Sequence, residues 1–140
     1  MLNKRLLKQA RGLEKADKVF KNALFVDVFN ERLLEDDIAV AEGIIIGTGV
    51  YEGKEEIDLA GKIVSPALID AHLHLESSMT NVDQFARVVI PRGTTTIVAD
   101  PHEIANVAGI TRIKYLLEAG KAQPWNFNLM LPSCVPASEF

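Results

Sequence analysis

The stretch GKIVSPALIDAHLH, at residues 61–74, decides the fold of the second half of the chain. After Pro66, residues 67–71 form an apolar run broken by one aspartate, and this pattern predicts a strand. His72 and His74 follow at its carboxyl end. Side chains two positions apart on a strand point to the same face, so we expect the two imidazoles to lie side by side.

The residues after this strand alternate between helical and strand patterns. The expected elements are a helix over 82–90 capped by Thr80 or Asn81, a buried strand over 94–99, a helix over 104–119 stopped by Gly120, and a strand over 127–131. Strand, helix, strand, helix, strand is the order of a parallel α/β domain. A closed eight-stranded barrel of this type needs about 250 residues, so residues 66–140 suffice for only three strands and two helices.

The first half of the chain has a different pattern of apolar residues. Apolar side chains at helical spacing over residues 1–16 predict a basic amphipathic helix, docked on the body of the protein or, alternatively, a targeting or membrane segment. Residues 17–65 predict short strands, among them separate ones at 19–20 and 25–29, and a hairpin turn at 41–43. Such closely spaced short strands favour a small β-sandwich or open barrel.

All three histidines of the chain follow the first two strands of this second half. In parallel α/β units of this kind the active site lies at the carboxyl ends of the strands. Two imidazoles on one face, His72 and His74, can bind a divalent metal ion, and imidazole suits zinc, iron, manganese or nickel. The alternative is a pair of histidines satisfied by hydrogen bonds in a polar core.

Polar side chains directly after the histidine pair are further candidates. Glu76 shares the face of the histidines if the strand continues, as a metal ligand, a partner of a histidine or a substrate contact. It is alternatively an ordinary loop carboxylate. Ser77 and Ser78 are candidate hydrogen-bond donors to a substrate, although serines in loops usually bond to the backbone.

The second strand ends in another group of ionisable residues, Asp100, His102 and Glu103. Burial at the mouth of a barrel would suit them to proton transfer or substrate orientation. Alternatively, Asp100 caps the next helix and His102 rests on its first turn. Ser133 and Cys134 follow the third strand. Cys134 could be a nucleophile or a ligand, but we expect its thiol to be buried.

Composition narrows the class of protein. Of the 140 residues, 48% are hydrophobic and 24% charged, as in folded globular proteins. The net charge of −4 gives no reason to expect a nucleic acid partner. A single cysteine excludes a disulfide within the chain, and it also excludes the P-C-x-x-C zinc site of the cytidine-type deaminases. Without a membrane-length apolar run or a secretory signal, we expect a cytoplasmic protein with no membrane partner.

Together, these motifs resemble those of the amidohydrolase superfamily. A small β-sandwich that leads through a Gly-Lys and Pro segment into Asp-x-His-x-His is its entry pattern, and residues 61–74 match it except that Ala67 replaces the usual glycine. Three stretches are similar to those of the bacterial adenine deaminases: HLHLESSM at 72–79, DPHEIANV at 100–107 and LPSCVPA at 131–137. The resemblance covers nearly the whole chain.

The resemblance implies a fold and a reaction. The fold would be α/β with an all-β part: a partial β-sandwich over 17–65, then the first three strands and two helices of a (β/α)₈ TIM barrel over 66–140. The reaction would be the hydrolytic deamination of adenine to hypoxanthine and ammonia by a metal-activated hydroxide. The metal centre would be binuclear, with manganese or iron and with zinc as a further option, and its first two ligands would be His72 and His74.

The resemblance also implies roles for the other polar residues. The candidates are Glu76, His102 and Glu103 for catalysis, and Ser77, Ser78 and Asp100 for substrate binding. The family's remaining metal ligands would lie beyond residue 140, so we expect the 140-residue chain alone to be inactive. Exposed strand edges further predict that it forms homo-oligomers or depends on missing sequence.

Two other interpretations stay open. The protein could be a different cyclic amidohydrolase, such as a relative of the hydantoinases or dihydroorotases, acting on a ring amide. It could also be a truncated structural or binding module that folds without turning over any substrate. Competition between adenine and hydantoins separates the first interpretation from an adenine deaminase, and a complete lack of turnover identifies the second.

Overall fold

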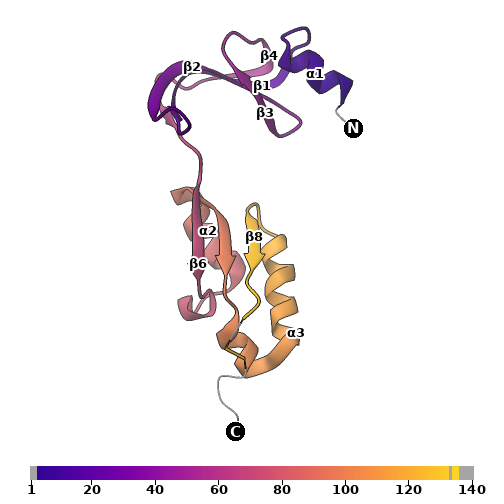
Figure 1. Ribbon diagram of the computed structural model, residues 1–140, viewed down its shortest axis with the longest axis vertical. Coiled ribbons are helices and arrows are strands. Elements are labelled where there is room, and N and C mark those ends of the chain that lie inside the picture. The colour runs from indigo at the N-terminus through magenta and orange to yellow at the C-terminus, as the bar shows by residue number, and fades with distance from the viewer. Residues whose placement is uncertain (1–2, 133, 136–140) are drawn as a thin grey trace. The chain divides into compact units, whose positions relative to one another are not determined.

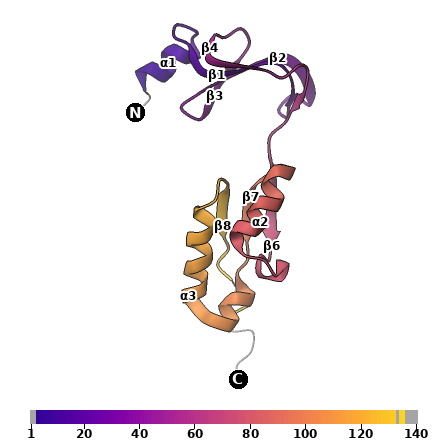
Figure 2. The ribbon, with the colours of Figure 1, turned by 180° about the vertical axis from the view of Figure 1, so that it is seen from behind.

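The computed structural model describes residues 3–132 and 134–135. The chain divides into two compact units, Met1–Pro66 and Ala67–Phe140, which Figure 1 and, from behind, Figure 2 show in different parts of the colour scale. The first unit is mostly sheet and the second alternates strands with helices, which confirms a mixed α/β class. None of the helices in the described part of the chain is both long and apolar enough to cross a membrane.

The first unit is a five-stranded sheet with one short helix. Its elements are α1 (Lys4–Ala10), β1 (Ala16–Asp27), β2 (Arg32–Ala41), β3 (Ile44–Thr48), β4 (Gly53–Asp58) and β5 (Ile63–Val64). The strand order is β3-β2-β1-β4, and β5 also pairs with β1. Antiparallel β2 lies along one edge of β1, and parallel β4 and β5 share the other. Because the described residues of this unit form one sheet, the second layer of a sandwich stays a prediction.

A two-residue turn joins β2 to β3. Ala41 pairs with Ile44, which leaves Glu42 and Gly43 as the loop. Both loop residues have positive φ, 51° and 75°, as a type I′ turn requires, and this turn matches the twist of the two strands. Gly43 adopts such a conformation without steric strain. The hairpin predicted at this position is confirmed.

β1 is one long strand where the sequence predicted two. The separate strands expected at 19–20 and 25–29 are wrong in their bounds, because pairing with β2 continues through a bulge-like irregularity. At this irregularity Asn22 has a φ of 54°, and its amide N–H donates to Asp37 Oδ1 at 3.0 Å. Lys21 Nζ donates to Asp37 Oδ2 at 2.8 Å. A carboxylate on β2 therefore holds the irregular part of β1 in place.

The helix predicted over residues 1–16 is shorter than expected. α1 ends at Ala10, because Gly12 takes a left-handed φ of 69° and turns the chain toward β1. The helix is docked on the sheet, as the first of the two interpretations of this segment predicted. Its last carbonyl, Ala10 O, accepts a hydrogen bond from the Tyr51 hydroxyl at 2.8 Å.

The interactions of the Asp17 carboxylate should make the stability of the first unit depend on pH under acidic conditions. Hydrogen bonds from the Lys54 side chain and from the Glu42 backbone lower the pKa of Asp17 from 3.8 to about 2. Because the folded-state pKa is depressed, this stabilisation is present above pH 3.8 and is lost as the pH falls through about 2. We expect Asp17→Asn to flatten the pH dependence of the free energy of unfolding in this window. Urea titrations at a series of pH values test this, and an unchanged slope would contradict it.

The second unit is built on a three-stranded parallel sheet. Its elements are β6 (Leu68–Leu73), η1 (Glu76–Ser78), α2 (Val82–Val89), η2 (Ile90–Arg92), β7 (Thr94–Ala99), α3 (His102–Lys121) and β8 (Asn126–Leu129). The strand order is β6-β7-β8, with both pairs parallel. The predicted alternation of strands and helices is confirmed. A closed barrel needs more strands than the described residues contain.

The core of this unit lies around its central strand. Ile97 of β7 is fully buried and belongs to one apolar cluster with Leu116 of α3 and Phe127 of β8. β6 lies at the edge of the sheet, and its Leu68 and Ile69 are 61% and 66% exposed. The apolar run that predicted β6 is therefore largely on the surface of the described chain.

One of two predicted helix ends is confirmed and the other is wrong. Asn81 is the N-cap residue of α2, as predicted, although its side chain makes no capping hydrogen bond. Gly120 was expected to stop α3 and instead lies within its last turn. A Cβ at Gly120 would come within 2.2 Å of the Phe127 ring, so the glycine is there for close packing. The unpredicted bend of α3 occurs at Gly109, which has a φ of 62°.

Candidate metal centre

The three histidines come together at one edge of the second unit. His72 and His74 lie at the carboxyl end of β6, and His102 begins α3 directly after β7. Because β6 and β7 are parallel neighbours, their carboxyl ends meet at the same edge of the sheet. The ring centroids of His72 and His74 are 5.1 Å apart, and those of His74 and His102 are 4.6 Å apart.

Two overlapping groups of side chains are able to hold a metal ion. One consists of His72, His74 and Asp100, and the other of His74, His102 and Glu103. Within each group the ligand atoms lie within 4.8 Å of one another, so small side-chain movements would bring three of them to one ion. His74 belongs to both groups and is therefore the central residue of the cluster.

Asp100 orients two of the imidazoles. His74 Nδ1 lies 3.1 Å from the Asp100 carbonyl oxygen, and His102 Nδ1 lies 3.1 Å from Asp100 Oδ2. A carbonyl and a carboxylate oxygen only accept hydrogen bonds, so each Nδ1 donates, and each neutral ring keeps an unprotonated Nε2. Metal-binding histidines usually have their other ring nitrogen held in this way.

The donor atoms present fit a divalent cation. Asp100 Oδ1 is buried and has no hydrogen-bond partner among the described residues. Leaving a buried acceptor unsatisfied costs about 1–3 kcal/mol, and a nearby cation would relieve this cost. Imidazole nitrogens together with carboxylate oxygens suit manganese, iron and zinc.

The short helix η1 contacts the first turn of α3 through two side chains. Glu76 Oε1 accepts a hydrogen bond from Ile104 N at 3.2 Å, and Ser77 Oγ donates to Glu103 Oε1 at 2.7 Å. Ser78 Oγ donates to a backbone carbonyl of its own turn at 2.6 Å, which is the usual local bond of a loop serine. Glu76 and Ser77 therefore reach α3, whereas Ser78 stays within its own segment.

The segment after β8 differs from its prediction. Cys134 is exposed and lies beyond the end of β8, outside the packed elements, so the expectation of a buried thiol is wrong. Ser133 lies outside the described residues. Asn106, which the sequence reasoning did not single out, donates from Nδ2 to His102 O at 2.9 Å and to Cys134 O at 3.0 Å. Its position one helical turn after His102 was the available signal.

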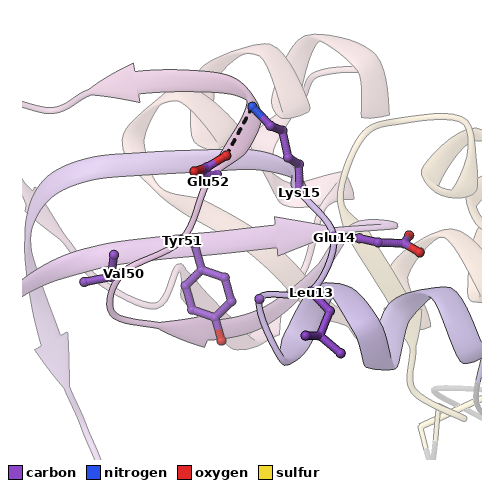
Figure 3. A pocket seen from close by; sticks show the side chains of 7 residues that line it. Leu13, Glu14, Lys15, Val50, Tyr51 and Glu52 are labelled. Carbon is purple, nitrogen blue, oxygen red and sulfur yellow. Dashed lines mark ion pairs between the residues drawn. The ribbon is translucent and has the colours of Figure 1, made fainter.

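The first unit has a cavity of its own with different chemistry. Its volume is about 530 Å³, and it lies between the segment after α1 and the segment after β3. Figure 3 shows Leu13, Val50 and Tyr51 around it, together with an ion pair between Lys15 Nζ and Glu52 Oε2 at 3.3 Å. No imidazole lines this cavity, so the candidate metal ligands lie in the second unit.

A family model covers the edge where these ligands meet. The model of the amidohydrolase family matches residues 63–139, which is more than half of the chain. The chain belongs to the amidohydrolase family. In this amidohydrolase the matched segment contains the parallel sheet and both groups of candidate metal ligands.

Several curated relatives of this amidohydrolase are adenine deaminases. The adenine deaminase of Petrotoga mobilis is 63% identical over 140 residues, which cover 100% of this chain and 25% of the relative. That of Archaeoglobus fulgidus is 53% identical over 135 residues, covering 96% of this chain and 24% of the relative. The chain therefore spans about a quarter of the length of these relatives.

A solved structure also matches part of this amidohydrolase. It is the N-acyl-D-glutamate deacylase of Bordetella bronchiseptica, which is 26% identical with a TM-score of 0.49. The match covers 61% of this chain and 19% of the deacylase. A likeness of this degree leaves the completed barrel a prediction.

Proposed function

We propose that this chain supplies the first metal ligands of an adenine deaminase, which hydrolyses adenine to hypoxanthine and ammonia. The observation that carries the proposal is the meeting of His72, His74 and Asp100 at one sheet edge. The similarity to adenine deaminases along the whole chain supports adenine as the substrate.

The proposed architecture has three parts. An N-terminal segment over 1–16, which contains the short helix α1, precedes a partial β-sandwich over 17–65, and residues 66–140 begin a TIM barrel. The parallel order β6-β7-β8, with a helix after each of the first two strands, supports the barrel. The exposed Ile45 and Ile63, at 67% and 66%, support further packing on the sheet of the first unit.

The proposed cofactor is a binuclear centre of manganese or iron, with zinc as the further option. His72 and His74 would be its first two ligands, and the buried, unpartnered Oδ1 of Asp100 supports this residue as a third. A divalent cation supplies a water activated for attack near neutral pH. The contact of Asp100 O with His74 Nδ1 keeps His74 Nε2 available to the cation.

The proposed proton-transfer groups lie on the first turn of α3. Glu103 Oε1 accepts a hydrogen bond from the Ser77 hydroxyl, so Oε2 is the oxygen available to take up and deliver a proton. His102 has its Nδ1 engaged by Asp100, and its Nε2 is available to contact the purine. Substrate contacts by Ser77, Ser78 and Asp100 stay predictions.

We further propose that the complete enzyme acts in the cytoplasm as a homo-oligomer. The single cysteine is consistent with a reducing compartment. An apolar groove of about 230 Å³ in the first unit, with Phe25, Ile38 and Ile45 among its lining, supports further contacts on that unit. Sedimentation of the protein purified under reducing conditions measures its oligomeric state.

A chimeric enzyme tests the proposed function. In it, this chain replaces the matching quarter of the Petrotoga mobilis adenine deaminase. We expect the chimera to form hypoxanthine from adenine, and we expect His74→Ala in the chimera to reduce turnover by more than roughly 100-fold, because the substitution removes a metal ligand rather than an outer-shell partner. The 140-residue chain alone should show no turnover.

The parent relative and an Asp83→Asn chimera serve as controls. Asp83 lies on α2, and its carboxylate bonds only to the neighbouring Gln84 in the described part of the chain. A folded chimera that binds metal without deaminating adenine would overturn the proposal. Turnover of a hydantoin in place of adenine would instead establish a different cyclic amidohydrolase.

A further inference from the structure

The helix that carries His102 begins without a side-chain cap of its own. Pro101 is the N-cap residue of α3, and its side chain makes no capping hydrogen bond. The first amide groups of a helix have no partner within the helix and need an acceptor from elsewhere. Pro101 is also fully buried, so the start of α3 is enclosed by other parts of the second unit.

Glu76 provides the missing acceptor from another element. Its Oε1 accepts from Ile104 N, the third residue of α3, at 3.2 Å. A capping side chain normally accepts a hydrogen bond from the amide of the second or third residue of the helix. The two partners are 28 residues apart in the sequence.

A second hydrogen bond joins the same two elements. Ser77 Oγ donates to Glu103 Oε1 at 2.7 Å, so consecutive residues of η1 hold consecutive residues of α3. The segment that follows His74 is thereby attached to the turn that carries His102. The ring centroids of these two histidines lie 4.6 Å apart.

The position of Glu76 argues against a direct chemical role. Both groups of possible metal ligands in the described chain exclude it, and one of its oxygens is already engaged by Ile104 N. The other oxygen, Oε2, is buried with no hydrogen-bond partner among the described residues. The bond from Ile104 N fixes the Glu76 side chain against α3.

We propose that Glu76 is a positioning residue, which caps α3 and, together with Ser77, fixes His102 and Glu103 opposite His74. We call the two hydrogen bonds from Glu76 and Ser77 to α3 the clamp. Its relevance to catalysis rests on the proposed function, whereas the clamp itself does not. Glu76 acts through a neutral property, the ability of Oε1 to accept a hydrogen bond. Its charge and its proton are not required.

The test compares Glu76→Gln with Glu76→Ala. Glutamine keeps an acceptor oxygen for Ile104 N and removes the ionisable proton, whereas alanine removes both. In the 140-residue chain we expect Glu76→Ala to speed hydrogen exchange at the Ile104 amide by about fivefold, the factor that corresponds to a typical cap. The same variant should shift the ring ¹⁵N resonances of His102. Glu76→Gln should leave both signals within about twofold of the parent.

Activity in the chimera provides the second readout. We expect Glu76→Gln to retain at least half of the turnover and Glu76→Ala to lose about tenfold, in the lower part of the range for outer-shell substitutions. Equal losses in the two variants, with Ile104 exchange unchanged, would overturn the proposal and give the carboxylate a chemical role. If Glu76→Ala does not fold, Ser77→Ala takes its place, because it removes only the bond between Ser77 and Glu103.

The two proposals fail in distinguishable ways. If the unsubstituted chimera does not deaminate adenine, the proposed function fails, but the exchange rate of the Ile104 amide still tests the clamp. If the chimera is active and the Ile104 amide exchanges equally fast in Glu76→Ala and the parent, only the clamp is overturned. Asp83→Asn is the matched control in both experiments because its carboxylate lies on α2, outside the clamp.

Discussion

Alanine at position 74 should lower the affinity of the chain for manganese or zinc more than any other single substitution. His74 belongs to both groups of candidate ligands, whereas His72 and His102 each belong to one. Outer-shell substitutions cost roughly 10–100-fold in metal affinity, so the loss of this ligand should exceed that range. Isothermal titration of the metal-free chain measures the effect.

The order of effects among the histidines is the informative result. His72→Ala should weaken binding strongly if the ion sits at His72, His74 and Asp100, and His102→Ala should then have the smaller effect. Asp83→Asn, a substitution on α2 outside both groups, should leave the affinity unchanged. Equal affinity in the parent and in His74→Ala would show that the ion binds elsewhere and would contradict the proposed centre.

Gly120→Ala should destabilise the second unit although alanine normally favours a helix. The new Cβ would come within 2.2 Å of the Phe127 ring. Overpacking a core costs about 1–3 kcal/mol, and the helix gains only about 0.5–1 kcal/mol from replacing glycine. We therefore expect the free energy of unfolding to fall by about 1–2 kcal/mol.

The single tryptophan reports on this substitution directly. Trp125 stacks on Phe127 with ring centroids 5.6 Å apart, so its fluorescence follows the affected part of the core during urea unfolding. In the Phe127→Leu background the smaller side chain leaves room for the Cβ, and Gly120→Ala should then cost at least about 0.5 kcal/mol less. A stabilising effect of Gly120→Ala in the parent would contradict the close contact.

Local sequence patterns were sufficient to predict most strands and helices of the second unit, because the spacing of apolar residues within each segment indicates its type. Where the sequence failed, a distant contact decided the outcome. Gly120 lies inside the helix instead of ending it, and the ring of Phe127 occupies the space that a side chain there would need. β1 continues through its irregularity because Asp37, on another strand, binds the Asn22 amide. Neither contact can be read from a window of neighbouring residues.

In the candidate site, too, local spacing predicted some features and distant contacts decided the others. The spacing of His72 and His74 placed two rings together, since alternation along a strand is a local property. The approach of His102 to His74 instead depends on the parallel register of β6 and β7. The bond between Glu76 and Ile104 also spans two segments, so the sequence offered Glu76 as a catalytic candidate and gave no sign of capping.

The pairing of β1 has a consequence for the order of events during synthesis. β1, β2 and β3 are complete once Thr48 has been translated, but the second edge of β1 waits for β4 and β5, which end at Val64. At roughly 5–20 residues per second the ribosome needs about 1–3 s for this interval. During that time the nascent chain displays an open strand edge to its neighbours. Slower translation of this stretch would extend the exposure and favour association between nascent chains.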